Sequence, residues 1–417
     1  MKRILTLVLT CIICALCLSG CSHSKKEVLK FSSWGSQSEV AILKPLLDEF
    51  ENENPDIEIE FMHAPAHYFS KLHLYFAAKM EPDVIFLNNL IFPKYLEADL
   101  FEDLTPYFKD EIKNETFFKN TIDAFSKDGK VYAIPRDISN VVIYYNKNVF
   151  DKLHLSYPKE NWTVDELYEL SKKLTLDTNK DGVTDIWGIN RSNKMIYWQP
   201  FLTVEGEKVL DKDGYLAINS QNSIKILQRY AELVTRDLAA PPDNVLAGKT
   251  YAQMFMNGEL AFFAGGRWNM PQFSRIKDFE WDVINFPQSK TSFIPADASG
   301  WAVAKRSKSK ENAVKLVKFL SSNHSIAKFT KSGLITPARK DIAQSDSFLN
   351  NPKNKNNQAF LYATQHSKPQ KLNGNIKEME DILLRALEPA FNGNETVEKI
   401  MHNKALIQDL CDLSKCK

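Results

Sequence analysis

The chain has 417 residues, of which 44% are hydrophobic and 25% are charged. This length exceeds what one ordinary core accommodates, so two domains are expected, and the composition is that of a soluble globular protein. The 53 basic residues nearly balance the 52 acidic ones. That balance excludes the basic excess of a nucleic-acid-binding protein and leaves neutral ligands open.

The N-terminus predicts export. Lys2 and Arg3 precede an apolar run from Ile4 to Leu18, which is short for a membrane span and typical of a secretory signal peptide. The run leads into Ser19-Gly20-Cys21, and its end resembles a bacterial lipobox. We therefore expect residues 1–20 to be removed, Cys21 to carry lipid, and 21–27 to form a tether at the periplasmic or extracellular face of a bacterial membrane.

In segment 29–88 the spacing of apolar residues alternates between that of strands and that of helices. The patterns predict strands over 29–34, 57–61 and 84–87, and helices over 37–53 and 68–80. This order is typical of an open α/β sheet, in which ligands bind beyond the carboxyl ends of the strands. Trp34 and Gln37 follow the first strand, and Asn88 follows the third.

The stretch Lys130–Phe150 is expected to join two lobes. Residues 131–134 and 141–145 are rich in β-branched and aromatic residues, and Pro135 and the pair Arg136-Asp137 stand between them. Because proline cannot donate to a ladder, one unbroken strand is not expected there. We infer that the chain leaves one sheet at the proline and enters a second by residue 141. Two strands of one domain with an exposed charged bend remain open.

Later segments continue the alternation. Helices are expected over 92–100, 117–125, 163–174, 223–235, 251–257, 309–321, 376–387 and 397–410, and strands over 186–188, 260–264, 282–286 and 301–304. One helix begins with a capping box, in which Thr163 is the N-cap and Glu166 follows three residues on. Near the end, Cys411 and Cys416 are free to pair outside the cytoplasm.

Eight segments resemble the family 1 extracellular solute-binding proteins, relatives of maltose-binding protein that serve sugar ABC transporters. They are FSSWGSQSEV (31–40), LLDEFENENPDIEIE (46–60), YFSKLHLYFAAKMEPDVIFLNN (68–89), GKVYAIPRDISNVVIYYNKNVFDK (129–152), NWTVDELYELSKKLT (161–175), GELAFFAGGRW (258–268), SGWAVAKRSKSKENAVKLVKFLSS (299–322) and GLITPARK (333–340). Each is a loose pattern alone, but eight in the expected order are specific.

The resemblance implies a type II periplasmic-binding-protein-like fold, with two α/β lobes joined by crossing strands and a ligand cleft between them. Crossings are implied near 135–137, 285–287 and 332–339. The expected domains are 28–135 with 287–335 as lobe 1, and 136–286 with 336–417 as lobe 2.

The resemblance also implies a function. The chain would be a monomeric receptor, not an enzyme and with no required cofactor, that binds a sugar or oligosaccharide and delivers it to the permease of an ABC importer. Sugar recognition needs aromatic faces and planar hydrogen-bonding groups. The candidate ligand-binding residues are Trp34, Gln37, Tyr68, Asn88, Arg136, Asp137, Trp198, Trp268 and Trp301. Core filling remains open for the tryptophans, although stacking is favoured for Trp268, which follows two glycines; Asn88 could instead cap its own turn.

A calcium site is a further candidate. Asp177, Asn179, Asp181 and Asp185 stand at positions 1, 3, 5 and 9 of a loop with Gly182 at position 6, the order of an EF-hand loop. Position 12 lacks the usual glutamate, so a complete Ca²⁺ site needs an acid from elsewhere. An Asx-rich turn is the other interpretation.

Two rival classes of function remain. The cluster of His63, His67 and His73 suggests a metal-binding receptor as one alternative. However, Pro65 keeps the first two histidines off a shared helix face. A lipid-anchored carbohydrate-active hydrolase would need aromatic residues and two carboxylates. No nucleophile elbow, HExxH motif or phosphate loop appears in the sequence. A receptor for a non-sugar solute is the remaining alternative.

Overall fold

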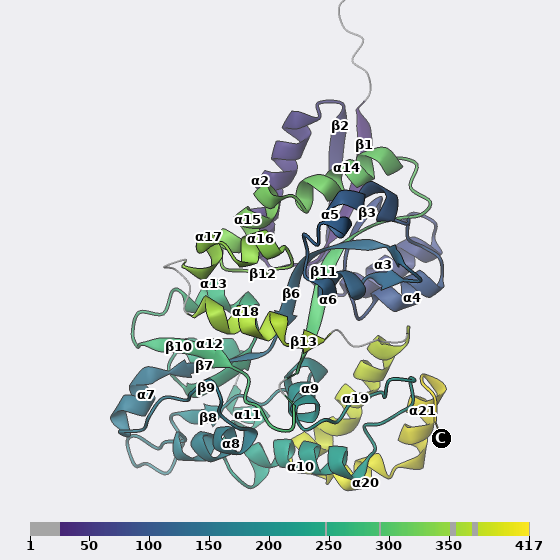
Figure 1. Ribbon diagram of the computed structural model, residues 1–417. Helices are drawn as coiled ribbons and strands as arrows, with labels where there is room; N and C mark the ends of the chain where they lie inside the picture. Colours follow the sequence, from purple (N-terminus) through teal and green to yellow (C-terminus); the bar gives the residue numbers. More distant parts are fainter. Residues whose placement is uncertain (1–25, 247, 292, 351–355, 369–373, 417) are drawn as a thin grey trace, which may run out of the picture.

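The computed structural model describes residues 26–246, 248–291, 293–350, 356–368 and 374–416. Two α/β lobes lie one above the other (Figure 1). The first contains a seven-stranded sheet in the order β12-β6-β11-β3-β1-β2, with β13 paired to β11. Its strands are β1 (Glu27–Ser33), β2 (Ile57–His63), β3 (Val84–Asn88), β6 (Ala133–Asn140), β11 (Ile294–Val303), β12 (Thr336–Pro337) and β13 (Ser367–Lys368). The β1, β2 and β3 strands are parallel, as expected for an open α/β sheet.

The second lobe contains a four-stranded sheet in the order β10-β7-β9-β8. Its strands are β7 (Val142–Asn146), β8 (Trp187–Ile189), β9 (Leu260–Gly265) and β10 (Trp281–Asn285). A separate hairpin joins β4 (Ser126–Lys127) to β5 (Lys130–Val131). The mixed α/β, two-lobed fold predicted from the sequence is confirmed.

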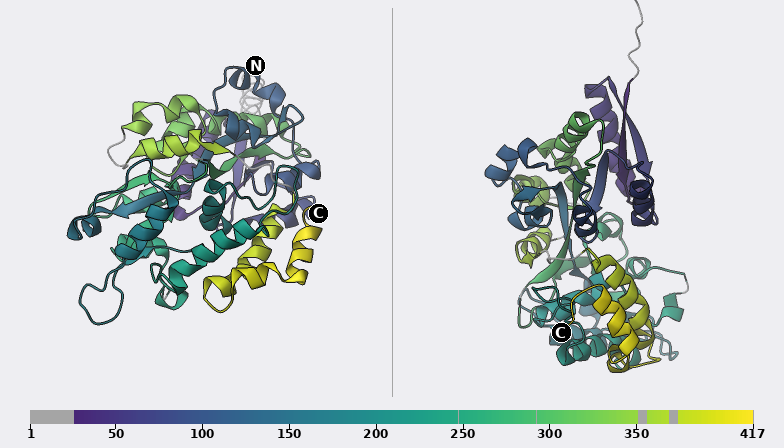
Figure 2. Two further views of the ribbon diagram at one scale, coloured as in Figure 1. Left: turned by 60° about the horizontal axis from the view of Figure 1, so that its bottom comes forward. Right: turned by 90° about the vertical axis from the view of Figure 1, so that its right-hand side faces the viewer.

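Helices surround both sheets (Figures 1 and 2). In chain order they are α2 (Gln37–Glu53), α3 (Tyr68–Ala77), α4 (Phe92–Glu97), η1 (Thr105–Tyr107), α5 (Lys109–Lys113), α6 (Lys119–Asp123), α7 (Lys147–Lys152), α8 (Val164–Lys173), α9 (Met195–Val204), α10 (Gln221–Thr235), α11 (Asp243–Leu246), α12 (Tyr251–Met256), η2 (Arg267–Asn269), α13 (Met270–Phe273), α14 (Lys310–Leu320), α15 (Asn323–Lys331), α16 (Lys340–Ala343), α17 (Asp346–Leu349), α18 (Asn357–Gln365), α19 (Ile376–Phe391), α20 (Val397–Met401) and α21 (Lys404–Asp412). No helix in the described ranges is both long and apolar enough to span a bilayer.

The buried hydrophobic residues form separate cores in the two lobes. First-lobe clusters draw on residues from Leu29 to Ile134 and from Ala298 to Ile342. The second-lobe cluster draws on 141–294 and 343–410, together with Phe118. The chain therefore passes between cores three times, within 134–141, 294–298 and 342–343. The exact domain bounds stay a prediction, but 136–140 and 336–337 pair within the first sheet instead of the second.

The expected break at Pro135 is wrong, because β6 runs through it. The ladder between β6 and β11 pairs Asp137 with Ser299 and Pro135 with Gly300, so Arg136 is an extra residue on β6. Such a bulge interrupts the ladder locally, which is where a strand tolerates proline. A Cβ on Gly300 would lie 2.4 Å from the carbonyl oxygen of Ile134, so the close approach requires glycine there.

Capping residues explain several element ends. The capping box of Thr163 and Glu166 forms as predicted at the start of α8. The single helix expected over 397–410 is instead two, because Asn403 accepts hydrogen bonds from the backbone of Ala405 and Leu406 and so starts α21. Cys411, within α21, and Cys416, after its end, form a disulfide. Helix α9 was not expected from the sequence.

Candidate functional site

A cleft of about 620 Å³ lies between the lobes. The first lobe contributes the ends of β1 and β3, the start of α3 and parts of β6 and β11; the second contributes α9, η2 and the first turns of α19. The lining residues are Trp34, Pro65, His67, Tyr68, Phe69, Ser70, Asn88, Ser139, Ile196, Trp268, Asp297, Ser299, Lys377 and Asp381. The carboxyl ends of parallel strands thus meet the cleft, as they do in open α/β sheets.

Aromatic side chains form the first-lobe wall. The ring centroid of Trp34 lies 5.3 Å from that of Tyr68, 5.5 Å from Phe69 and 4.2 Å from Phe86. The Tyr68 hydroxyl donates to the carbonyl oxygen of Phe86 at 2.8 Å and also bonds the hydroxyl of Ser32. Burial raises the pKa of Tyr68 well above its usual range, so its hydroxyl stays neutral. The wall is therefore both apolar and held in place.

Trp268 stands on the second-lobe side, directly after strand β9. The two glycines before it are required by packing: a Cβ on Gly266 would lie 1.9 Å from the Trp268 ring. Arg267 is buried beneath, with its guanidinium 4.5 Å from the ring centroid of Phe348, and its Nη1 donates to Asn357 Oδ1 at 2.6 Å. These contacts hold η2, and with it the partly exposed indole of Trp268, against the cleft.

Polar groups lie between the aromatic walls. Asn88 Oδ1 accepts from the backbone of Ile91 at 3.3 Å, so this residue also caps its own turn. Ser299 and Asp297 project from β11 into the lining. Burial raises the pKa of Asp297 to about 7, and the nearby carboxyl groups of Glu380 and Asp137 act in the same direction. The cleft therefore combines flat apolar faces with hydroxyl, amide and carboxyl groups.

Four of the candidate residues are brought together here: Trp34, Tyr68, Asn88 and Trp268. The candidates Trp198 and Trp301 lie in the cores instead, at 0% and 1% exposure. Trp198 donates its indole N–H to the carbonyl oxygen of Asn193. Trp301 packs near Phe86. Placing these two tryptophans in the cleft was wrong.

Gln37, Arg136 and Asp137 do not line the cleft either. Gln37 is exposed in the first turn of α2. Arg136 is buried, donates from Nη1 to Glu39 Oε1 at 2.6 Å and from Nε to Asp137, and stacks over Phe86 at 4.2 Å. The Arg-Asp pair is thus an internal ion cluster of the first lobe, not a group between the lobes.

Sequence reasoning missed most of the other lining residues, among them Phe69, Asp297, Lys377 and Asp381. Phe69 is adjacent to a candidate and carried a usable signal, an aromatic pair at a helix start. Asp297 was missed because the strand was expected to begin only at residue 301. Lys377 and Asp381 of α19 lie far along the chain from the other lining residues, and no local sequence pattern marks them as cleft residues.

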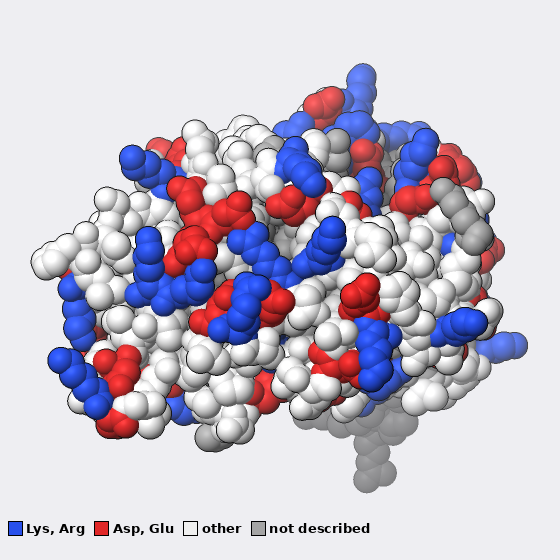
Figure 3. Space-filling view, turned by 90° about the horizontal axis from the view of Figure 1, so that it is seen from below, with Lys and Arg blue, Asp and Glu red and all other residues white. Residues whose placement is uncertain are grey.

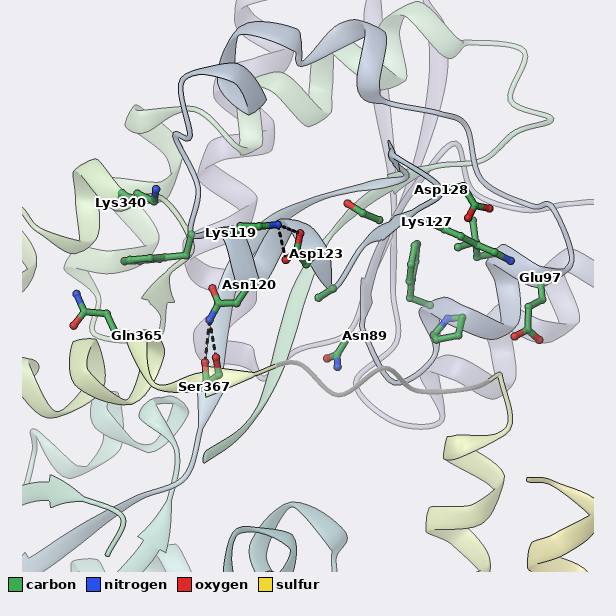
Figure 4. A pocket seen from close by; sticks show the side chains of 16 residues that line it. Asn89, Glu97, Lys119, Asn120, Asp123, Lys127, Asp128, Lys340, Gln365 and Ser367 are labelled. Atoms are coloured by element: carbon green, nitrogen blue, oxygen red, sulfur yellow. Dashed lines mark hydrogen bonds and ion pairs between the residues drawn. The ribbon is translucent and has the colours of Figure 1, made fainter. Parts of the chain in front are cut away.

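A larger hollow of about 970 Å³ lies under the first lobe, lined by α4, α6 and the β4–β5 hairpin. Figure 4 shows two of its polar side chains, Lys119 and Asn120, engaged with neighbouring residues. Lys119 pairs with Asp123, and Asn120 donates to Ser367 and to the carbonyl oxygen of Thr364. It lacks the tryptophan walls of the cleft, so we place the candidate site in the cleft.

The calcium loop closes on itself. Asp177 accepts from the backbone of Lys180 and Gly182, and Asp185 accepts from the backbone and hydroxyl of Thr178. These are the bonds of an Asx-rich turn. Among the described residues, no group of three or more His, Cys, Asp or Glu side chains is arranged to hold a metal ion. The bonds as placed favour the Asx-rich turn, and the calcium site stays a prediction.

The three histidines also separate. His63 Nε2 lies 2.9 Å from the carbonyl oxygen of Gly35, and His73 Nδ1 lies 3.1 Å from the hydroxyl of Tyr95. Only His67 lines the cleft. The geometry therefore gives no support to a shared metal site. Cys21 lies outside the described residues.

Two lobes, three crossings and a cleft at the strand ends define the class of two-lobed α/β binding receptors. The chain belongs to the family of bacterial extracellular solute-binding proteins, whose family model matches residues 46–356. Membership implies an extracytoplasmic location. The multiple sugar-binding protein of Streptococcus mutans is 25% identical over 341 residues, covering 77% of this chain and 78% of that protein. The galactooligosaccharide-binding protein of Bacillus subtilis is 23% identical over 408 residues, covering 92% and 90%.

Solved structures agree on the fold. An ABC substrate-binding protein from Listeria monocytogenes in complex with cycloalternan superposes with a TM-score of 0.83 at 27% identity, covering 93% of this chain and 98% of that one. The maltose/maltodextrin-binding domain from Bdellovibrio bacteriovorus bound to maltotriose gives 0.77 at 20% identity, covering 92% and 100%. Because the Bdellovibrio protein is only 20% identical, its likeness to this chain shows the fold alone.

Proposed function

We propose that this protein is the solute receptor of an ABC importer, and that it binds a sugar or oligosaccharide in the cleft and passes it to the permease. The observation that carries this is the pairing of walls: Trp34, Tyr68 and Phe69 on one lobe and Trp268 on the other, with Asn88 among the polar groups. Aromatic faces pack against sugar C–H patches, and the polar groups meet hydroxyls. The sugar complexes of its relatives support the same class of ligand.

A thermal-shift screen of mono- and oligosaccharides tests the proposal. A ligand that binds only the folded state stabilises it by about 2.7 kcal/mol at a hundred times its Kd. We expect at least one sugar to raise the melting temperature saturably, and calorimetry to give one site per chain. If amino acids, peptides or metal ions shift melting and no sugar does, the ligand class is wrong.

The same samples distinguish a receptor from a hydrolase. We expect an oligosaccharide that binds to be recovered intact after long incubation. Product sugars that accumulate with time and protein concentration would favour the enzyme instead. Size-exclusion chromatography with light scattering should give one chain per particle with or without ligand.

Lipid attachment at Cys21 completes the proposed receptor. The motif Leu18-Ser19-Gly20-Cys21 supports it. Cys21→Ser should release the protein from the membrane fraction and remove the lipid mass from the mature chain. A variant that stays as membrane-bound as the wild type would refute the anchor.

A further inference from the structure

A smaller cavity of about 110 Å³ adjoins the cleft. It shares three lining residues with the cleft, Ser139, Ile196 and Asp297. We call it the side cavity. Because a water molecule occupies about 30 Å³ in the liquid, the side cavity has room for roughly three to four waters or one small substituent. The side cavity and the cleft therefore adjoin at these residues.

The side cavity has an acidic and otherwise uncharged lining. Its polar members are Asn89, Ser139, Gln199, Asp297 and Glu380, and its other members are apolar. None of the ten residues that line it, all of which the structure describes, is Lys, Arg or His. The surface differs: seen from below, basic and acidic side chains are interspersed (Figure 3). The overall charge balance of the chain thus does not extend into this cavity.

The one lysine or arginine that lines the adjoining cleft is already paired. Lys377 Nζ donates to Glu380 Oε2 at 2.9 Å and to Asp381 Oδ1 at 2.7 Å, both on its own helix α19. No ion pair among the described residues includes Asp297. Among the described residues, Glu380 has a cation and Asp297 has none.

The other charged groups near Asp297 in the described part of the chain do not supply a counter-charge. On β6, Asp137 is held by Arg136, which also serves Glu39, so this cluster is itself net negative. On the first-lobe wall, the only lining side chain with a basic nitrogen is the imidazole of His67. Burial raises the pKa of Asp297 to about 7, with Glu380 and Asp137 adding to the effect. Asp297 is only partly exposed. A carboxylate that is partly withdrawn from water with no described counter-ion is costly, and a cation brought by the ligand would reduce that cost.

We propose that the ligand of this receptor is an amino-substituted sugar whose ammonium group enters the side cavity and pairs with Asp297, with Glu380 beside it. This rests on the proposed function and specifies its substrate class. An ammonium group fits the lining because its three N–H donors match carboxylate, hydroxyl and amide oxygens. A bare metal ion fits less well, because no described group of three His, Cys, Asp or Glu residues is arranged to hold one.

Matched sugars that differ at one substituent test the proposal. We would measure calorimetric Kd values for glucose, glucosamine and N-acetylglucosamine, for the corresponding galactose series, and for the β-1,4-linked trimers of the glucose series. In the series that binds, the amino member should bind about tenfold or more tightly than the hydroxyl member at pH 7, since charge-assisted hydrogen bonds are roughly twice as strong as neutral ones. Its advantage should shrink at pH 5, where Asp297 is protonated.

Asp297→Asn supplies the decisive variant, because it keeps the shape and removes the charge. It should abolish most of the amino preference, so that the amino member loses more affinity than the hydroxyl member does. Asp48→Asn makes the same chemical change at an exposed pair with Lys44 on α2 and should leave every Kd unchanged. Thermal melting of both variants establishes that they fold.

The outcomes separate the two proposals. Binding of neutral or N-acetylated sugars as tightly as amino sugars would overturn the amino-sugar assignment and leave the sugar receptor standing. An amino preference that survives Asp297→Asn would overturn the role of the side cavity. Failure of every sugar in these series, with binding of another solute class, would overturn both.

Discussion

Replacing Asp297 by asparagine should change how the stability of the ligand-free protein depends on pH. The carboxyl group has a pKa raised from 3.8 to about 7 by burial and by the carboxyl groups of Glu380 and Asp137. In the unfolded chain it titrates near 4. Between those values the folded state holds a proton that the unfolded state has lost, so the free energy of unfolding falls as pH rises through this window and levels off above pH 7.

The magnitude follows from the size of the shift. One pKa unit corresponds to about 1.4 kcal/mol, so the two units between pH 5 and pH 7 correspond to at most about 3 kcal/mol. Asp297 is partly exposed to the cleft, and solvent there reduces the value to about 2 kcal/mol. Asparagine does not titrate and fills the same volume. The variant should therefore be similar to the wild type at low pH and more stable by about this amount at pH 8.

Urea unfolding of both proteins at pH 5, 6, 7 and 8, followed by circular dichroism, measures the effect. We expect the difference in unfolding free energy, Asp297→Asn minus wild type, to grow with pH and to saturate above pH 7. The exposed change Asp48→Asn should give a flat difference. Parallel pH profiles for Asp297→Asn and the wild type would show that the carboxyl group titrates normally, and would remove the electrostatic basis of the side-cavity argument.

Three further predictions concern an ion cluster of the first lobe, two tryptophans and the loop 177–185. Arg136→Met leaves two buried carboxylates without a cation and should cost about 3–5 kcal/mol in urea unfolding; a loss below 1 kcal/mol would mean that water reaches the cluster. Trp268→Ala should weaken sugar binding at least several-fold with little loss of stability, whereas Trp301→Ala should cost about 3–5 kcal/mol and leave the folded fraction binding normally; the reverse pattern would exchange their roles. Because the oxygens of loop 177–185 bond its own backbone, the metal-stripped protein should have the same melting temperature in calcium as in chelator, measured by thermal shift. A higher melting temperature in calcium would mean that the loop oxygens rearrange around the ion.

Local signals located much of the fold. The capping box at Thr163 and the glycine pair before Trp268 each act within a few residues, so their consequences are readable from the sequence. The predicted strand break at Pro135 was wrong because a bulge depends on the partner strand. Gly300, far along the chain, allows the close approach of β11 that accommodates the bulge. A proline rule applied to one strand cannot include that partner.

The site was less predictable, for a different reason. Trp34 and Trp301 both stand in or beside apolar strands, but one faces the cleft and the other the core. Which face a strand residue occupies follows from register, and a shift of one position reverses it. Lys377 and Asp381 reach the cleft through the packing of α19, and that packing is a property of the assembled second lobe.

Two of the three segments that join the lobes are hydrogen-bonded to one another. Asn140 of β6 pairs with Ala296 of β11, and Ile294 of β11 pairs with Ser367 of β13. A ribbon of paired strands bends across its flat face but resists sliding, because sliding would break the ladder. We therefore expect the lobes to swing about one axis, so that Trp268 approaches Trp34 along a single arc. Ligands of different length would then be accommodated by the angle at which the swing stops, with the two walls always meeting in the same register.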